Sequence, residues 1–145
     1  TATEYVDEVA GIDELHTMLA RADYVCLHTP LTEDTRDMLG PDEFAAMKPG
    51  AYFLNGARGG IVDEDALLQA LQSGHLNGAY SDVFATEPLP ADSPLWDAPN
   101  LIISPHVSDS IANWEVRYVD FFAINLQRWL DGQKLLNIVD GSLGY

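Results

Sequence analysis

Apolar runs alternate with amphipathic stretches over roughly the first hundred residues of the chain. The runs predict short strands at 23–28, 51–55, 78–84 and 100–105. The amphipathic stretches between them predict helices at 11–22, 40–50 and 62–75. Strands that alternate with helices in this way are typical of a parallel sheet with crossover helices. We therefore expect an α/β fold, with 23–28 as a buried strand.

Local signals support the helix assignments. Asp63 stands where the third helix needs an N-cap, and Gly74 stands where that helix should end. Pro41 suits the first turn of the second helix.

Residues 85–99 contain four prolines and no periodicity, which predicts a long loop with a functional role or a packed surface.

A long amphipathic helix is predicted at 113–133, ended by Gly132. We expect a domain division between 1–112 and 113–145. Two interpretations of the helix stay open: its apolar stripe packs into the core, or it contacts another domain or a second subunit. The stripe consists of Tyr118, Phe121, Phe122, Leu126 and Trp129.

Composition and charge narrow the possible partners. The 145 residues include 7 Lys and Arg and 23 Asp and Glu, which gives a net charge of −16. Such a surface repels nucleic acid and anionic lipid, so we expect neither as a partner. No apolar run approaches the roughly 18 residues that span a membrane. The single cysteine, Cys26, fits a reducing compartment, and we expect a cytoplasmic protein.

Polar residues that could carry chemistry follow the predicted strands. They are His28, Arg58, Asp82, Glu87 and His106. Ligands of open parallel α/β sheets bind beyond the carboxyl ends of the strands, so we expect these residues to gather at one edge. No metal site is predicted.

Three of these residues suit the chemistry of a carbonyl next to a carboxylate. Arg58 could pair with the carboxylate and polarise the carbonyl. His106 could transfer a proton near neutral pH, and Glu87 could orient its ring and raise its pKa. Taken singly, each also has a structural interpretation: a surface ion pair for Arg58, a solvated loop carboxylate for Glu87 and a turn cap for His106.

Four segments together resemble the D-isomer-specific 2-hydroxyacid dehydrogenases. They are "LHTPLTEDTRDMLG" (27–40), "MKPGAYFLNGARGGIVDEDALLQAL" (47–71), "DVFATEPLPADSPLW" (82–96) and "ISPHVS" (103–108). Their order and spacing match that family over nearly the whole chain. The resemblance implies a Rossmann-type parallel sheet and hydride transfer between NAD or NADP and a small 2-hydroxy or 2-oxo acid, such as hydroxypyruvate or glyoxylate. It also implies a homodimer.

The resemblance assigns roles by position. Arg58 would bind the substrate carboxylate, His106 would be the acid–base, and Glu87 would be its partner. Asp82 would bind the nicotinamide carboxamide, and the small residues around Arg58, Gly59 among them, would let ligands approach the main chain. The implied cofactor-binding set is His28, Thr29, Pro30, Ala57, Arg58, Asp82 and His106.

Departures from the family pattern qualify these expectations. Gly56 stands where the family usually has Thr, Ser or Ala, and Ser81 stands where it usually has an aliphatic residue. Asp109 follows His106 closely, where it could alter the site or cap the long helix. No GxGxxG occurs in the sequence. We therefore expect the chain to be the C-terminal portion of a longer enzyme, with the first βαβ unit missing, and to be inactive alone. A nucleotide-sensing corepressor of the same fold is the alternative function.

Overall fold

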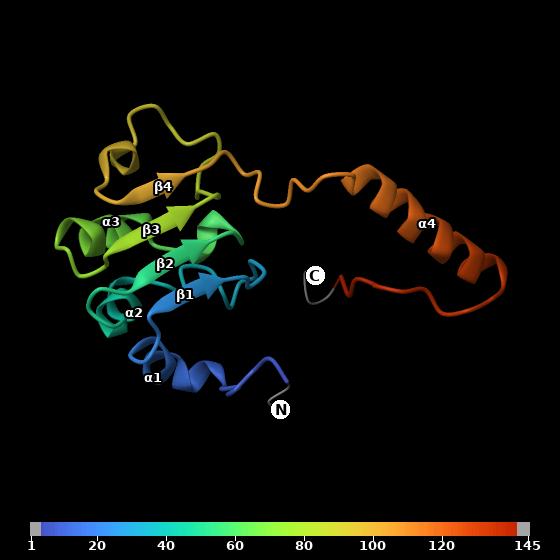
Figure 1. The fold of residues 1–145 in the computed structure, drawn as a ribbon, viewed down its shortest axis with the longest axis horizontal. Coiled ribbons are helices and arrows are strands. Elements are labelled where there is room, and N and C mark those ends of the chain that lie inside the picture. Colours follow the sequence, from blue (N-terminus) through green and yellow to red (C-terminus); the bar gives the residue numbers. More distant parts are fainter. Residues whose placement is uncertain (1–3, 142–145) are drawn as a thin grey trace. The chain divides into compact units, whose positions relative to one another are not determined.

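The computed structural model describes residues 4–141 and divides into two compact units, one ending at His106 and one beginning at Val107. The first unit holds a four-stranded sheet in the order β1-β2-β3-β4, and every neighbouring pair is parallel. In Figure 1 the four arrows accordingly point the same way. The predicted parallel sheet is confirmed. Its strands are β1 (Tyr24–Leu27), β2 (Tyr52–Asn55), β3 (Gly78–Ser81) and β4 (Leu101–Ile103).

Helices connect the strands, as the alternating pattern predicts. The expected helix at 11–22 is shorter than predicted, because a 3₁₀ turn precedes a brief α-helix. The loop between β3 and β4 also contains a 3₁₀ turn. The helical elements of the first unit are η1 (Ile12–Glu14), α1 (Leu15–Leu19), α2 (Pro41–Ala46), η2 (Gly59–Ile61), α3 (Glu64–Gln72) and η3 (Pro94–Asp97).

Side chains and glycines fix the ends of these helices where the sequence predicts. The Asp63 carboxylate accepts hydrogen bonds from the backbone N–H groups of Asp65 and Ala66, at 3.0 and 3.1 Å. Gly74 follows α3 with a φ of 72°, in the left-handed region that glycine adopts without strain. The N-cap at Asp63 and the helix end at Gly74 are therefore confirmed.

One face of the sheet packs against α1, α2 and α3. Leu27, Phe53 and Ala79 from the strands belong to the same buried cluster as Leu19 and Leu67 from the helices. Phe53 is completely buried and meets Phe44 edge to face, with ring centroids 5.3 Å apart. Burying one such side chain contributes about 1.5–3 kcal/mol, so this helical layer stabilises the sheet from one side.

The opposite face of the sheet is uncovered within the first unit. Successive strand residues point to opposite faces, and register places Cys26, Leu54, Tyr80 and Ile102 in one row. Ile102 is 67% exposed. β1 is also an edge strand, with Tyr24 and Cys26 exposed, so the prediction of a buried strand at 23–28 is wrong. The apolar residues at 23–28 predict burial correctly only for the face of β1 that packs against the helices.

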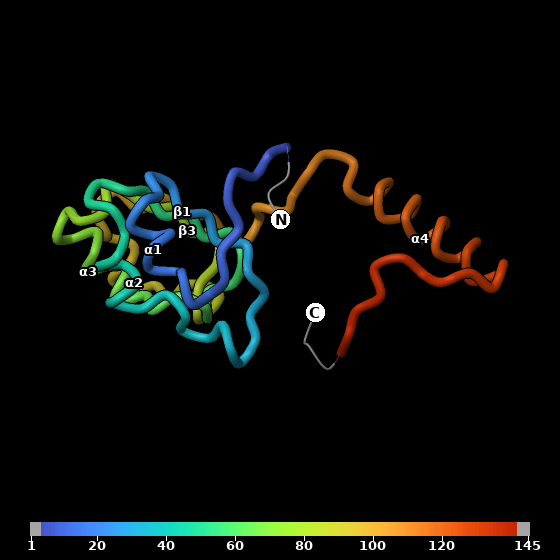
Figure 2. The backbone as a smooth tube through the Cα atoms, turned by 90° about the horizontal axis from the view of Figure 1, so that it is seen from below, coloured from blue at the N-terminus to red at the C-terminus, as the bar shows by residue number. Residues whose placement is uncertain are grey.

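The second unit is built around α4 (Trp114–Leu130), which Figure 2 shows as one unbroken coil followed by a returning tail. Asn125 holds the tail, because its Oδ1 accepts from the Leu136 N–H at 2.8 Å. α4 buries none of its residues within its own unit, so both interpretations of its apolar stripe stay open. The helix begins directly after Asn113, close to the predicted start, and Asp109 is not its N-cap. Within residues 4–141, no helix is long and apolar enough to cross a membrane.

Candidate active site

The loop after β2 is shaped by Asn55, the last residue of that strand. Its buried side chain accepts a hydrogen bond from the Ala57 N–H at 3.0 Å and donates to the Arg58 carbonyl at 3.4 Å. The Asn55 carbonyl also accepts from the Asp82 N–H at 3.0 Å. One buried amide therefore fixes the loop that carries Arg58 and joins it to the end of β3.

The Arg58 side chain lies exposed beside this loop. Its Nη1 donates to the Ala57 carbonyl at 2.7 Å. Among the described residues, Arg58 has no carboxylate within 4.0 Å. In a chain with net charge −16, a guanidinium without an acidic neighbour keeps its charge available for an external anion.

Gly59 has a different purpose from the one that the resemblance implies. A Cβ built on Gly59 would lie 1.9 Å from the carbonyl carbon of Phe84 and 2.4 Å from the nitrogen of Ala85. The space beside Gly59 is thus filled by the protein's own backbone, so the expectation that this glycine admits a ligand is wrong. Gly59 instead brings the Arg58 loop against the loop that carries Glu87.

Glu87 and His106 form a direct polar contact in the site. His106 Nδ1 lies 2.7 Å from Glu87 Oε2, and Glu87 Oε1 accepts from the Phe84 N–H at 2.8 Å. The bond to His106 and then the bond to Phe84 lower the pKa of the Glu87 carboxyl below its usual value. An ionised carboxylate only accepts hydrogen bonds, so Nδ1 carries a proton and Nε2 is the ring nitrogen left for a ligand.

A backbone hydrogen bond holds His106 next to Asp82. The His106 N–H donates to the Asp82 carbonyl at 2.8 Å, and His106 has a φ of 55°. A non-glycine residue in this left-handed region carries strain of about 1–3 kcal/mol, and such residues cluster at functional sites. Asp82 itself is completely buried, and its Oδ1 accepts from the Ser104 hydroxyl.

These residues line a pocket of about 610 Å³. Glu87, His106, Asp82 and Ser104 supply its polar groups, while the remaining walls are apolar or aromatic. The apolar walls are Phe84, Pro88, Leu89, Trp96, Ile103 and Pro105. Apolar walls with a few convergent polar groups are typical of sites that bind small molecules.

The other predicted residues lie outside the lining of this pocket. Arg58 and Ala57 sit on the loop after β2, and His28, Thr29 and Pro30 follow β1. The Thr35 hydroxyl shapes the latter loop, because it donates to the Pro30 carbonyl at 2.7 Å and accepts from the Thr32 N–H at 2.8 Å. All the predicted residues follow carboxyl ends of parallel strands. Hydrogen bonds join Glu87 to His106, and His106 to Asp82.

Sequence reasoning missed several residues that organise the site. Side-chain hydrogen bonds from Asn55, Ser104 and Thr35 hold predicted residues in place. Tyr80 in turn bonds to Ser104. A polar residue at the end of an otherwise apolar strand is the signal that could have indicated Asn55 and Ser104. Nothing in the sequence around Tyr80 predicts its contact, which depends on strand register.

Comparisons with known proteins show which family the chain resembles. The family model of the D-isomer specific 2-hydroxyacid dehydrogenase NAD binding domain matches residues 1–108. Glyoxylate/hydroxypyruvate reductase B of Citrobacter koseri is 50% identical over 105 residues, which cover 72% of this chain and 32% of that protein. The chain thus spans about a third of the length of this curated relative.

Solved structures give the same result. A D-isomer specific 2-hydroxyacid dehydrogenase from Xanthobacter autotrophicus Py2, in complex with NADPH and MES, superposes with a TM-score of 0.90 at 40% identity, covering 100% of this chain and 59% of that one. The NADPH-dependent glyoxylate/hydroxypyruvate reductase of Sinorhizobium meliloti, in complex with NADP and sulfate, gives 0.86 at 33% identity, covering 99% and 47%. The chain therefore belongs to the NAD-binding domain family of the D-isomer-specific 2-hydroxyacid dehydrogenases.

Proposed function

We propose that the protein carrying this chain reduces a small 2-oxo acid, hydroxypyruvate or glyoxylate, to the D-2-hydroxy acid. The hydrogen-bonded Glu87–His106 pair beside a buried Asp82 carries this proposal. When bound, NAD(P)H supplies the hydride that reduces the carbonyl carbon. Family membership supports this chemistry, and so do the reductase names of the matched relatives.

The protein's own residues bind the acid and deliver a proton. Arg58 pairs with the substrate carboxylate and polarises the neighbouring carbonyl oxygen. His106, protonated on both nitrogens, donates the Nε2 proton to that oxygen as it becomes an alcohol. Glu87 keeps the His106 ring oriented through Nδ1 and stabilises the positive charge of that ring. Because the pKa of the Glu87 carboxyl is lowered, Glu87 stays ionised down to acidic pH.

The cofactor proposal assigns the nicotinamide end to the pocket described above. Asp82 and His106 would contact the carboxamide side of the ring, with Ala57 and the backbone of Arg58 beside it. His28, Thr29 and Pro30 would contact the cofactor from the end of β1. NADPH is the first cofactor to test, because both solved structures described above hold NADPH or NADP.

The test is turnover by the protein at its full natural length. Oxidation of NADPH and NADH is followed with hydroxypyruvate and glyoxylate, for wild type and for Arg58→Ala and His106→Ala. Each variant should lose at least about 100-fold in kcat/KM, the usual contribution of a positioned acid–base or anion-binding residue. Arg21→Ala is the matched control, because Arg21 pairs with Glu8 on the surface and should leave turnover unchanged.

A different result would change the assignment. Tight cofactor binding without oxidation by any 2-oxo acid would refute the reductase and favour the nucleotide-sensing corepressor. Equal rates in wild type and both site variants would show that another group does the chemistry.

The proposal includes a cytoplasmic location, which the single free thiol of Cys26 supports.

We also propose a homodimer formed through the uncovered face of the sheet. All-parallel sheets are usually covered on both faces. A groove of about 560 Å³ runs over this face, and its lining, which includes Tyr24, Tyr52, Tyr80 and Ile102, contains no charged residue. In a two-fold contact each copy presents the same patch, so this uncharged surface lets two strongly acidic chains approach without facing their charges.

A further inference from the structure

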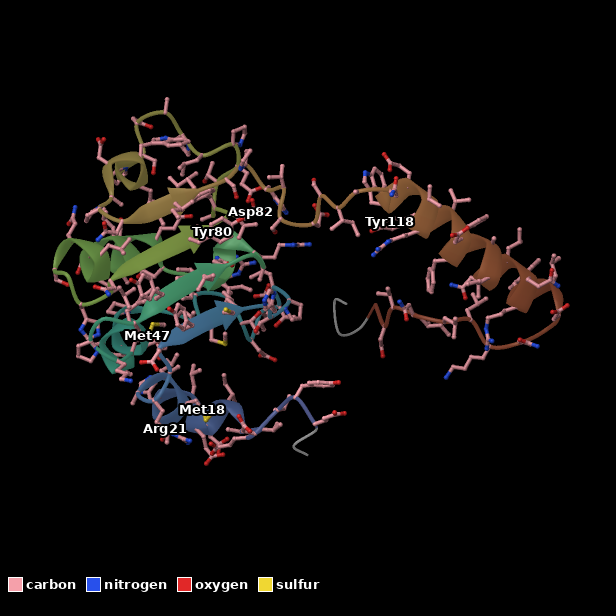
Figure 3. All side chains as sticks on the ribbon, viewed as in Figure 1. Met18, Arg21, Met47, Tyr80, Asp82 and Tyr118 are labelled. Atoms are coloured by element: carbon pink, nitrogen blue, oxygen red, sulfur yellow. The ribbon has the colours of Figure 1, made fainter. Side chains whose placement is uncertain are left out.

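A chain of two hydroxyl groups leads from β3 to the buried Asp82 carboxylate. Tyr80 lies in β3, and Ser104 is the first residue after β4. The two hydroxyl oxygens are 2.8 Å apart, and the Ser104 hydroxyl donates to Asp82 Oδ1. Figure 3 labels Tyr80 and Asp82 close together at the carboxyl end of β3.

The number of protons fixes the direction of this chain. A serine hydroxyl has one proton to donate. Because that proton points to Asp82, the Ser104 oxygen must accept from Tyr80, and the Tyr80 phenol is the donor. Successive bonds in one direction polarise each other, so the bond from Tyr80 strengthens the one that Ser104 donates to the carboxylate.

Strand pairing determines where this chain of two hydroxyl groups forms. β3 and β4 are in register with Tyr80 opposite Ile102 and Ser81 opposite Ile103, and the Ser104 N–H donates to the Ser81 carbonyl at 3.1 Å. This pairing sets Ser104 beside Asp82. Ser104 and Asp82 both line the pocket of the proposed active site, whereas Tyr80 lines the groove on the uncovered face.

We propose that Tyr80 and Ser104 are positioning residues that aim the Asp82 carboxylate at the cofactor. The inference rests on the proposed contact between Asp82 and nicotinamide. A completely buried carboxylate is costly unless hydrogen bonds satisfy it, and the bond it accepts restricts the orientation of its oxygens. Ser104 fixes one oxygen directly, and Tyr80 holds Ser104 in the donating geometry.

The test measures cofactor kinetics of the protein at its full natural length, with hydroxypyruvate as substrate. Ser104→Ala should raise the KM for NADPH about tenfold, because it removes a bond to a charged group. Tyr80→Phe, which removes only the distal oxygen, should raise it about threefold. The KM for hydroxypyruvate should stay within twofold in both variants. Ser104→Thr keeps the hydroxyl and should restore the wild-type value.

Asp82→Ala separates this proposal from the one on which it rests. Ser104→Ala should add nothing in the Asp82→Ala background, since both changes act on one contact. If Asp82→Ala raises the KM for NADPH while Ser104→Ala and Tyr80→Phe do not, the role of Asp82 stands and the positioning role is overturned. If Asp82→Ala leaves that KM unchanged, the proposed nicotinamide contact is wrong, and the hydroxyl chain loses its function with it. A lower Tm in Ser104→Ala with unchanged cofactor kinetics also overturns the proposal.

Discussion

Replacing Gly59 with alanine should separate the two loops that form the site. The new Cβ would lie 1.9 Å from the Phe84 carbonyl carbon and 2.2 Å from its oxygen. Carbon atoms normally approach to about 3.5 Å, so the Phe84 backbone would have to retreat by about 1.6 Å. No flexible side chain can absorb this displacement, because the contacted atoms are main chain.

Overpacking of this kind costs about 3 kcal/mol, which lowers the Tm by roughly 6–12 °C for a chain of this size. The displacement also moves the Phe84 N–H away from Glu87, so the Glu87–His106 pair should lose its position. Misplacement by about 1 Å can reduce turnover roughly 100-fold.

Thermal unfolding followed by far-UV circular dichroism measures the first effect. Gly60→Ala is the matched control, because the nearest atoms to its Cβ belong to the flexible side chains of Leu31, at 3.3 Å, and Arg36, at 3.5 Å. It should shift the Tm by less than about 2 °C. If the Gly59→Ala protein has the same Tm as the Gly60→Ala protein, the close packing of the two loops is refuted.

Three further predictions concern a helix cap, a carboxylate and the sheet face. Asp63→Ala should reduce the free energy of unfolding by about 1 kcal/mol in urea titrations, while Asp63→Asn should preserve the cap. Because the pKa of Glu87 is lowered in the fold, its stabilising contribution should be complete above pH ~4.3 and disappear as the pH falls through the lower folded value. The Tm difference between wild type and Glu87→Gln, measured from pH 7 to pH 3, checks this and should be largest at the neutral end. Ile102→Glu should convert the proposed dimer to monomer in light scattering, whereas Val9→Glu, equally exposed elsewhere, should not; a dimer that survives Ile102→Glu would exclude the uncovered face as the interface.

Periodicity was sufficient to locate most elements of the first unit, because the strands and helices are short and punctuated by glycine, proline and Asp63. It could not tell that Tyr24 and Cys26 are exposed, since that depends on whether another element covers β1. The same limit applies to α4, whose apolar stripe is evident in the sequence but is not buried within its own unit.

The Glu87–His106 contact follows from the order of strands, so a parallel sheet and two strand-end positions suffice to anticipate it. Tyr80 and Ser104 could not be anticipated, because their contact depends on the register of β3 and β4 to within one residue. The neighbour of Gly59 is equally hidden, because Phe84 belongs to a separate loop. The roles assigned to the site residues stay predictions until turnover is measured.

The position of Trp96 has an optical consequence. The chain has three tryptophans, and the other two, Trp114 and Trp129, belong to α4. Trp96 alone lines the pocket, where its indole N–H donates to the Pro90 carbonyl at 2.8 Å. Indole emits light in the range that reduced nicotinamide absorbs. A ring bound in this pocket would therefore quench Trp96 by energy transfer, and the protein would report its own cofactor occupancy without any added label.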